Sequence, residues 1–140
     1  MNYNSICIIL AGGKGSRLDG KGKLNQNFNN KTLLEQVYNK VKNQFSYVAV
    51  NVNNAKRNTK LNIETVYDKF SDNIGPLAGI HAALCQGNKK LGKDGHVCIV
   101  PVDTPFLPKD LRKRLHNNIF KNKSEVVFAR SGNRIHPTIG

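Results

Sequence analysis

The sequence is poor in cysteine, in acidic residues and in long hydrophobic runs. Its three cysteines, Cys7, Cys85 and Cys98, lie far apart and form no C-x-x-C pair, which argues against a zinc site or a disulfide framework. We therefore expect a cytoplasmic protein in a reducing environment. The apolar run that begins at Ile6 is too short to cross a membrane, and no basic segment precedes it. We expect neither a signal peptide nor a membrane partner.

The scarcity of acidic residues leaves a strongly basic chain. Nine aspartates and glutamates stand against 22 lysines and arginines, which gives a net charge of +13. Such a charge raises the question of nucleic-acid binding. However, the lysines are spread along the whole sequence among many asparagines, with no basic stripe interleaved with aromatic residues. We expect no nucleic-acid partner, and we interpret the charge as a field that attracts small anions.

The hydrophobic content, 39% of 140 residues, suffices for the core of a single domain over residues 1–140. Strand-like apolar runs alternate with amphipathic segments, which predicts a three-layer α/β/α, Rossmann-like fold with a mainly parallel sheet. Residues 21–31 are polar and predict a loop. The expected strands are Ile6–Leu10, Tyr47–Val52, Ile63–Asp68, His96–Val102 and Glu125–Ala129, and the expected helices are Lys31–Phe45, Pro76–Gly87 and one that turns Leu111, Leu115, Ile119 and Phe120 toward the sheet.

The first apolar run ends in a turn that is rich in glycine and in cations. Gly12, Gly13 and Gly15 lack a Cβ atom, so the main chain can come close to a ligand and point its N–H groups at it. An arginine beside such a turn can hold phosphate oxygens in a two-point fork. The turn predicts a polyanionic ligand; the alternative is an ordinary glycine turn with incidental lysines. The cations of this segment are Lys14, Arg17, Lys21 and Lys23.

Two common phosphate motifs do not fit this turn. The dinucleotide pattern G-x-G-x-x-G fails because Leu18 stands at its last position. The P-loop pattern G-x-x-x-x-G-K-[ST] fits from Gly15 to Lys21 but then has Gly22 where a metal-binding hydroxyl is required. The turn therefore belongs to neither class.

Polar side chains stand at the ends of three later strands. Asn51 could read the hydrogen-bonding edge of a base, although an asparagine in a turn is the commoner role. Asp68 ends the next strand, at the edge where open α/β sheets place their ligands. Asp103 follows a nearly continuous apolar strand that predicts a position inside a parallel sheet. Its carboxylate suits a magnesium ion on nucleotide phosphates, or else a turn or helix N-cap.

A second group of basic residues lies close to the last residue of the sequence. Arg130, Arg134 and His136 precede Pro137. They could bind the phosphate of an acceptor, or they could belong to a solvated loop. His136 is held toward extended geometry by the proline that follows it, so we expect it to shape the loop rather than to titrate in catalysis.

The glycine turn resembles the L-A-G-G-x-G-x-R-[LM] loop of the nucleotidyltransferase superfamily. Within that superfamily, several motifs in order resemble the molybdenum cofactor guanylyltransferases, and the similarity extends from the first strand to the last residue. The matching residues are Leu10-Ala11-Gly12-Gly13 with Arg17-Leu18 and Lys23, Asn51-Val52-Asn53, Asp68, Gly75-Pro76-Leu77-Ala78-Gly79, Pro101-Val102-Asp103-Thr104-Pro105-Phe106 and His136-Pro137-Thr138.

This resemblance implies a reaction and a set of partners. The family transfers GMP from magnesium-bound GTP to the terminal phosphate of molybdopterin, which gives molybdopterin guanine dinucleotide and pyrophosphate. The implied partners are GTP, molybdopterin and other proteins of molybdenum cofactor biosynthesis, and the implied cofactor is Mg²⁺, held by Asp103. The implied catalytic residues are Arg17, Lys23 and Asp103, and the implied nucleotide-binding residues are Leu10, Ala11, Gly12, Gly13, Lys23, Asn51, Asp68 and Asp103.

The sequence departs from the family pattern at two places. Gly22 precedes Lys23 where family members have Gly-x-Asp-Lys, and the carboxylate occurs earlier, as Asp19. Family members also continue for several dozen residues after His-Pro-Thr, so we expect the C-terminal part of the family fold to be missing. Two alternatives therefore stay open: a cytidylyltransferase for molybdopterin or for a sugar or polyol phosphate, and a non-catalytic GTP-binding remnant.

Overall fold

The computed structural model describes residues 4–12, 27–53, 59–70 and 75–140. Its centre is a four-stranded sheet in which every neighbouring pair is parallel, in the order β5-β4-β1-β6. From β1 the chain continues to β4 and then to β5 on one side of β1, and it returns to β6 on the other side. The strand order therefore reverses between β1 and β6. The parallel sheet predicted from the apolar runs is confirmed. The four strands are β1 (Ser5–Leu10), β4 (Tyr47–Val52), β5 (Glu64–Tyr67) and β6 (His96–Pro101).

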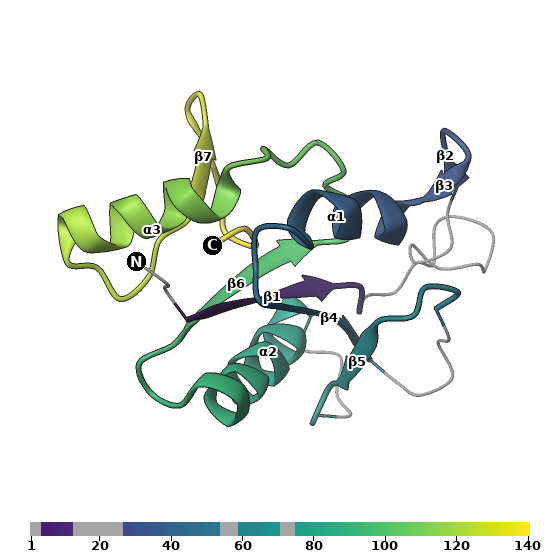
Figure 1. Ribbon diagram of the computed structural model, residues 1–140, viewed down its shortest axis with the longest axis horizontal. Coiled ribbons are helices and arrows are strands. Elements are labelled where there is room, and N and C mark those ends of the chain that lie inside the picture. Colours follow the sequence, from purple (N-terminus) through teal and green to yellow (C-terminus); the bar gives the residue numbers. More distant parts are fainter. Residues whose placement is uncertain (1–3, 13–26, 54–58, 71–74) are drawn as a thin grey trace.

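In the described part of the chain, helices cover the sheet on both faces (Figure 1). Helices α1 (Leu33–Val41) and α3 (Leu111–Asn122) lie on one face, and α2 (Pro76–Leu91) lies on the other. Strand β1 contributes side chains to the cores on both faces of the sheet, because successive side chains of a strand point to opposite faces. Cys7 and Ile9 pack with the α1 and α3 side, while its even-numbered apolar residues pack on the α2 side. The three-layer arrangement predicted from the sequence is therefore confirmed.

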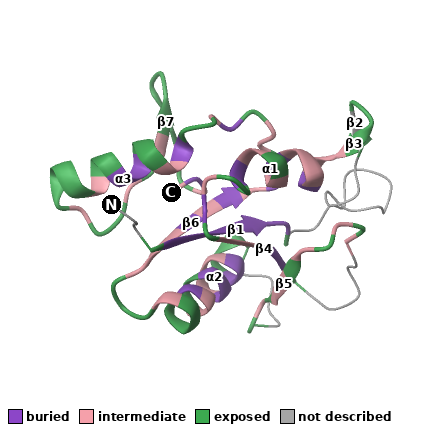
Figure 2. Cartoon of the chain, viewed as in Figure 1, coloured by how far each residue is buried: buried purple, intermediate pink, exposed green. Residues whose placement is uncertain are grey.

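The central strand β1 is buried along its whole length, whereas the edge strand β5 is partly exposed (Figure 2). All six residues of β1 are buried, as a strand covered on both faces requires. Cys7 and Cys98 lie opposite one another in the β1–β6 register, and both are buried free thiols. Within the described ranges, no helix is long and apolar enough to cross a membrane.

Helix α1 is shorter than its amphipathic pattern predicts. It begins after Thr32, whose hydroxyl accepts a hydrogen bond from the Glu35 backbone N–H at 3.1 Å. The Glu35 carboxylate accepts one from the Thr32 backbone N–H at 2.7 Å, which completes a capping box. The helix ends at Val41 rather than at Phe45. The residues before it form a two-stranded hairpin, β2 (Asn27–Phe28) with β3 (Lys31–Thr32), inside the segment that the sequence predicted as a loop.

One further expectation about the last third of the chain is wrong. The final strand does not cover residues 125–129; the strand begins only at Ala129, and a hairpin of β7 (Ala129–Ser131) and β8 (Arg134–His136) follows. The edge of β6 is met by Gly140, which exchanges two backbone hydrogen bonds with Ile99, of 2.7 and 3.2 Å. Phe120 reaches the edge of the sheet, as predicted, because its ring lies 6.0 Å from the ring of His96, the first residue of β6. It is half exposed, and its ring lies 6.0 Å from the ring of His116.

A candidate nucleotide site at the carboxyl ends of the strands

A pocket of about 220 Å³ opens where β1, β4 and β6 end. This is the edge at which the strand order reverses, the usual ligand position in open α/β sheets. The start of α2 and Thr138 complete its wall. Six of the residues predicted to bind the nucleotide line it: Leu10, Ala11, Gly12, Asn51, Asp68 and Asp103. Gly12 and Asp103 therefore line the same pocket, whereas their binding roles remain predictions.

Backbone hydrogen bonds fix the start of the glycine turn relative to its neighbours. The Ala11 N–H donates to the Asn51 carbonyl at 2.9 Å, and the Val102 N–H donates to the Leu10 carbonyl at 2.9 Å. These bonds extend the hydrogen bonding of the sheet beyond the ends of β1 and β6. The turn that carries Gly12 and the turn that carries Asp103 are therefore both attached to the central strand.

Asn51 is the most constrained polar group of the pocket. It is 1% exposed, and its Nδ2 amide donates to Asp68 Oδ1 at 2.7 Å and to the Val66 carbonyl at 3.3 Å. Two acceptors on that side identify it as the NH₂ side, so the oxygen Oδ1 points the other way. No hydrogen-bond donor from the described part of the chain reaches Oδ1. A buried acceptor in a ligand pocket, held in one orientation, suits a ligand that brings an N–H group.

Two glycines give Asn51 its space. A Cβ on Gly79, in the first turns of α2, would lie 2.5 Å from Asn51 Oδ1 and 3.1 Å from a Leu10 methyl carbon. A Cβ on Gly12 would lie 3.4 Å from the same oxygen and 3.7 Å from Asp68 Oδ2. A glycine on a helix often lets that helix approach another backbone. The close neighbour is instead the side chain of Asn51.

Asp103 stands on the turn that follows β6. The hydroxyl and the N–H of Thr104 both donate to the Pro101 carbonyl, at 2.7 and 3.3 Å, which closes this turn and leaves the Asp103 side chain exposed at its tip. Asp103 is not a helix N-cap, because α3 begins eight residues later, at Leu111, and has Asp110 as its N-cap. The turn and ligand interpretations of Asp103 are compatible in this geometry.

The structure does not test every predicted residue. Gly13, Lys14, Arg17 and Lys23 lie outside the described ranges, so their predicted roles stand on the sequence alone. Sequence reasoning assigned no ligand contact to Gly75, Pro76, Gly79 or Thr138, which line the pocket. The sequence did contain a signal for these four residues, because they belong to the Gly-Pro-Leu-Ala-Gly and His-Pro-Thr motifs.

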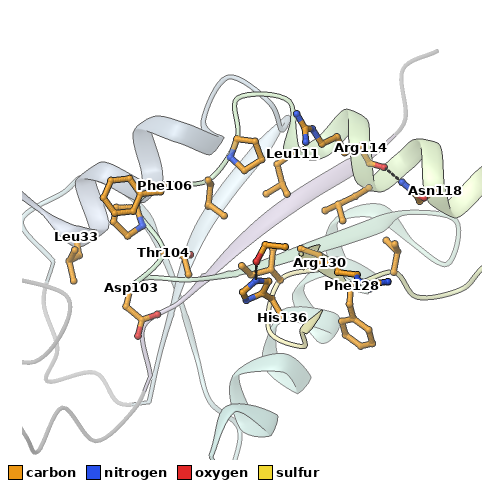
Figure 3. Close-up of a pocket in the computed structure, with 18 residues that line it drawn as sticks. Leu33, Asp103, Thr104, Phe106, Leu111, Arg114, Asn118, Phe128, Arg130 and His136 are labelled. Atoms are coloured by element: carbon orange, nitrogen blue, oxygen red, sulfur yellow. Dashed lines mark hydrogen bonds between the residues drawn. The ribbon is translucent and has the colours of Figure 1, made fainter. Parts of the chain in front are cut away.

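A larger pocket of about 920 Å³ lies on the α1 and α3 side of the sheet (Figure 3). Asp103 lines this pocket as well as the smaller one. Of the second basic group, Arg130 and His136 line the larger pocket, whereas Arg134 does not. His136 Nε2 lies 2.7 Å from Ser131 Oγ across the β7–β8 hairpin.

An open parallel sheet with a glycine, a fixed amide and two carboxylates at its order reversal is typical of α/β domains that bind their ligands at this edge. Comparison with known proteins narrows this class. Residues 7–140 match the family described as the MobA-like NTP transferase domain, so the chain belongs to that family.

Its relatives include proteins named molybdenum cofactor guanylyltransferase. The protein from Pasteurella multocida is 34% identical over 142 residues, which cover 99% of this chain and 71% of the relative. The protein from Aliivibrio salmonicida is 33% identical over 132 residues, which cover 94% of this chain and 65% of the relative. The chain thus spans about two thirds of the length of these relatives.

Solved structures share the fold. The crystal structure of molybdopterin-guanine dinucleotide biosynthesis protein A from Archaeoglobus fulgidus superposes with a TM-score of 0.73 at 22% identity, over 96% of this chain and 65% of that one. A protein from Aquifex aeolicus superposes with a TM-score of 0.67 at 26% identity, over 99% of this chain and 68% of that one. The α/β architecture is therefore that of known members of this structural group.

Proposed function

We propose that this chain transfers GMP from magnesium-bound GTP to molybdopterin, in the cytoplasm, and releases pyrophosphate. The observation that carries the proposal is the pocket in which Gly12, Asn51, Asp68 and Asp103 meet at the strand-order reversal. The names of the relatives supply the acceptor and the base. A nucleotidyl transfer needs mainly positioning and neutralisation of charge, and these residues can supply both.

The orientation of Asn51 favours guanine over cytosine. Its Oδ1 is a buried acceptor, and the Asp68 carboxylate beside it adds further acceptor capacity. Guanine offers a ring N–H and an amino group next to each other, whereas cytosine offers one amino group next to two acceptors. A site built from acceptors therefore pairs better with guanine, and unmatched buried polar groups discriminate strongly between ligands.

Asp103 fits a magnesium ion that is bound mainly by phosphates. Among the described residues, no three histidine, cysteine, aspartate or glutamate side chains gather into a metal site of their own. Mg²⁺ commonly takes one or two carboxylates and completes its octahedron with substrate phosphates and water. Asp103, exposed at the tip of its turn and lining the pocket, suits this role. When bound, the ion would neutralise charge on the triphosphate.

The residues of the chain would act by holding the reactants. The acceptor phosphate is itself the nucleophile, so no side chain has to form a covalent intermediate. Asn51 and Asp68 would fix the base, and the backbone of Leu10, Ala11 and Gly12 would lie along the nucleotide. Arg17 and Lys14 would stabilise the departing pyrophosphate, and Lys23 would contact the nucleotide; these three roles are predicted from the sequence.

Pyrophosphate release from GTP, Mg²⁺ and molybdopterin tests the proposal. We expect release by the wild type, loss of release in Asp103→Ala with an unchanged circular dichroism spectrum, and weaker GTP binding in Lys23→Ala. Unchanged turnover of the Asp103 variant would refute the metal role. Binding of GTP without release would identify a nucleotide-binding protein that does not catalyse transfer. Competition between GTP and CTP tests the base, and tighter binding of CTP would refute the choice of guanine.

A further inference from the structure

An open groove of about 380 Å³ lies between the segment that follows α1 and the first turns of α3. Arg112, one of its residues, donates from Nε to Ser5 Oγ at 2.9 Å, and Ser5 is the first residue of β1. The groove is therefore at the amino end of the central strand, roughly 16 Å of strand away from the nucleotide site at the carboxyl end. Its lining shares no residue with that site or with the larger pocket.

Positive charge dominates this groove. Its lining holds three cations and one carboxylate, which belong to Lys109, Arg112, Lys113 and Asp110. The Asp110 carboxylate accepts a hydrogen bond from Arg114 Nε at 2.8 Å, and Arg114 lines the larger pocket rather than the groove. Lys109 and Lys113 are exposed, and neither is paired with a carboxylate of the described residues. The charge of these two lysines is therefore available to an anionic ligand.

Hydrogen bonds fix the two walls of the groove relative to one another. The side chain of Gln44 accepts from the Arg112 backbone N–H at 3.0 Å and donates to the Pro108 carbonyl at 3.1 Å. The same amide nitrogen donates to the Lys40 carbonyl at 2.7 Å, which ties it to the last turn of α1. The Arg112 guanidinium is held in turn by Ser5. A groove whose walls are already in place loses little freedom when a ligand binds.

The other groups of the lining favour an acidic peptide over a nucleic acid or a phosphate. Asn43 and Asn117 bring side-chain amides. An amide offers both a donor and an acceptor, which match the carbonyl and N–H groups of a peptide backbone, whereas ionised phosphate oxygens only accept. Of the described residues in the lining, only His116 has a ring, and it is 5% exposed, so no base could stack on it. From Lys109 to Asn117 the groove follows about 12 Å of chain, which about four extended residues would span.

We propose that this groove is a docking site for an extended acidic segment of a partner protein, whose carboxylates meet Lys109, Arg112 and Lys113. An arginine can hold a carboxylate in a two-point fork, and the exposed lysines add charge that steers the segment toward the groove. The net charge of +13 acts in the same direction. The inference does not rest on the proposed function, because the groove and the nucleotide site lie at opposite ends of β1.

Helix α3 and its flanking residues supply a matched pair of double variants. Lys109→Gln/Lys113→Gln removes two charges from the groove. Lys121→Gln/Lys123→Gln removes two charges at the far end of the helix, where neither side chain lines the groove. All four lysines are exposed, so both variants should keep the fold, which urea denaturation checks. Only the first variant should lose affinity for an acidic peptide.

The probe is a fluorescein-labelled peptide with about four consecutive glutamates, titrated with the protein at about 0.15 M salt and followed by fluorescence anisotropy. We expect the wild type to bind it, and Lys109→Gln/Lys113→Gln to bind it about tenfold more weakly, as the loss of two exposed ion pairs predicts. Lys121→Gln/Lys123→Gln should stay within about twofold of the wild type, because distant charges are largely screened at this salt concentration. The matching glutamine peptide should not bind measurably.

Absence of peptide binding by the wild type would overturn the inference, and so would equal losses in the two double variants, since the peptide would then respond to net charge alone. Inorganic tripolyphosphate and a single-stranded oligonucleotide serve as competitors. If either bound the groove more tightly than the peptide, the groove would be a phosphate site instead.

The affinity of each variant for a fluorescent GTP analogue is measured separately and should not change. A loss of that affinity in Lys109→Gln/Lys113→Gln would join the groove to the nucleotide site and overturn the inference. Failure of the wild type to bind the analogue would refute the proposed function, whereas selective binding of the acidic peptide by the same protein would still support the docking site.

Discussion

Replacing Gly79 by alanine should disturb the nucleotide site through a single methyl group. The new Cβ would lie 2.5 Å from Asn51 Oδ1, a separation that requires Asn51 to move. Asn51 cannot rotate freely, because its amide nitrogen is bound to Asp68 and to the Val66 carbonyl. We expect the variant to break at least the bond to Asp68.

Two contributions set the magnitude. Overpacking of a buried site costs about 1–3 kcal/mol, and loss of a hydrogen bond to a charged group costs about 1.5–3 kcal/mol. The free energy of unfolding of Gly79→Ala should therefore fall by roughly 2.5–6 kcal/mol. Displacement of Asn51 from the position where it would meet the base should weaken GTP binding by about 10- to 100-fold, since each factor of ten corresponds to about 1.4 kcal/mol.

Gly87→Ala is the matched control. Gly87 lies on the same helix and is also buried, but a Cβ there would collide with Val97 on β6 rather than with Asn51. Urea denaturation should show that both variants are destabilised. Titration of the folded proteins with a fluorescent GTP analogue should show weakened binding in Gly79→Ala alone. If Gly79→Ala bound the analogue as tightly as the wild type, the assignment of Asn51 to the nucleotide would be refuted.

Three further measurements test the packing of the fold. Desolvation by burial, together with the neighbouring His96 and Arg112, lowers the pKa of His116; the unfolded chain therefore binds more protons, and stability should fall as the pH drops below about 6.5. Urea denaturation between pH 5 and 8 checks this, and an equally steep pH dependence in His116→Phe would contradict it. Thr32→Ala should cost about 1 kcal/mol by removing the α1 cap, and an unchanged urea midpoint would exclude a role for the capping box. Among the three thiols, only that of Cys85 should react quickly with a thiol reagent in the native protein, and a fast phase that survives Cys85→Ser would disagree with the core packing.

Burial explains the last of these expectations. Cys7 is completely buried, and desolvation, with Cys98 beside it, raises the pKa of the Cys7 thiol well above its usual value. Cys98 is buried on the neighbouring strand, whereas Cys85 is partly exposed on α2. Reaction of the two buried thiols should therefore wait for unfolding.

The architecture could be predicted because its signals are local. The apolar run from Ile6 to Leu10 and the run that leads to Asp103 carry the mark of strands buried on both faces. The spacing of apolar residues in α1 and the Gly-Pro start of α2 mark helices. The register of β1 between β4 and β6 then brings the three strand ends to one edge of the sheet.

The errors have physical causes that the sequence does not contain. Val126 to Phe128 have the composition of a strand, but the pairing positions on β6 are met by Gly140. A β-propensity needs a partner to become a strand. Such outcomes depend on contacts between distant segments.

Some features of the candidate site could likewise be predicted from the sequence, and others could not. Asn51, Asp68 and Asp103 were found because polar groups at strand ends collect at one edge of a parallel sheet. The contact between Gly79 and Asn51 joins a helix to a strand 28 positions away, and no local pattern reports it. The larger pocket forms between α3 and the β7–β8 hairpin, so it too emerges only from the folded chain.

The shared position of Asp103 has a thermodynamic consequence. A carboxylate that belongs to two cavities makes their occupants interdependent: if one compound tightens the hold on the other, linkage requires the same factor in return. The coupling between the two ligands would then be the same whichever of them binds first, so the order of binding would depend only on kinetics. A substitution of Asp103 alone would change the affinities of both pockets.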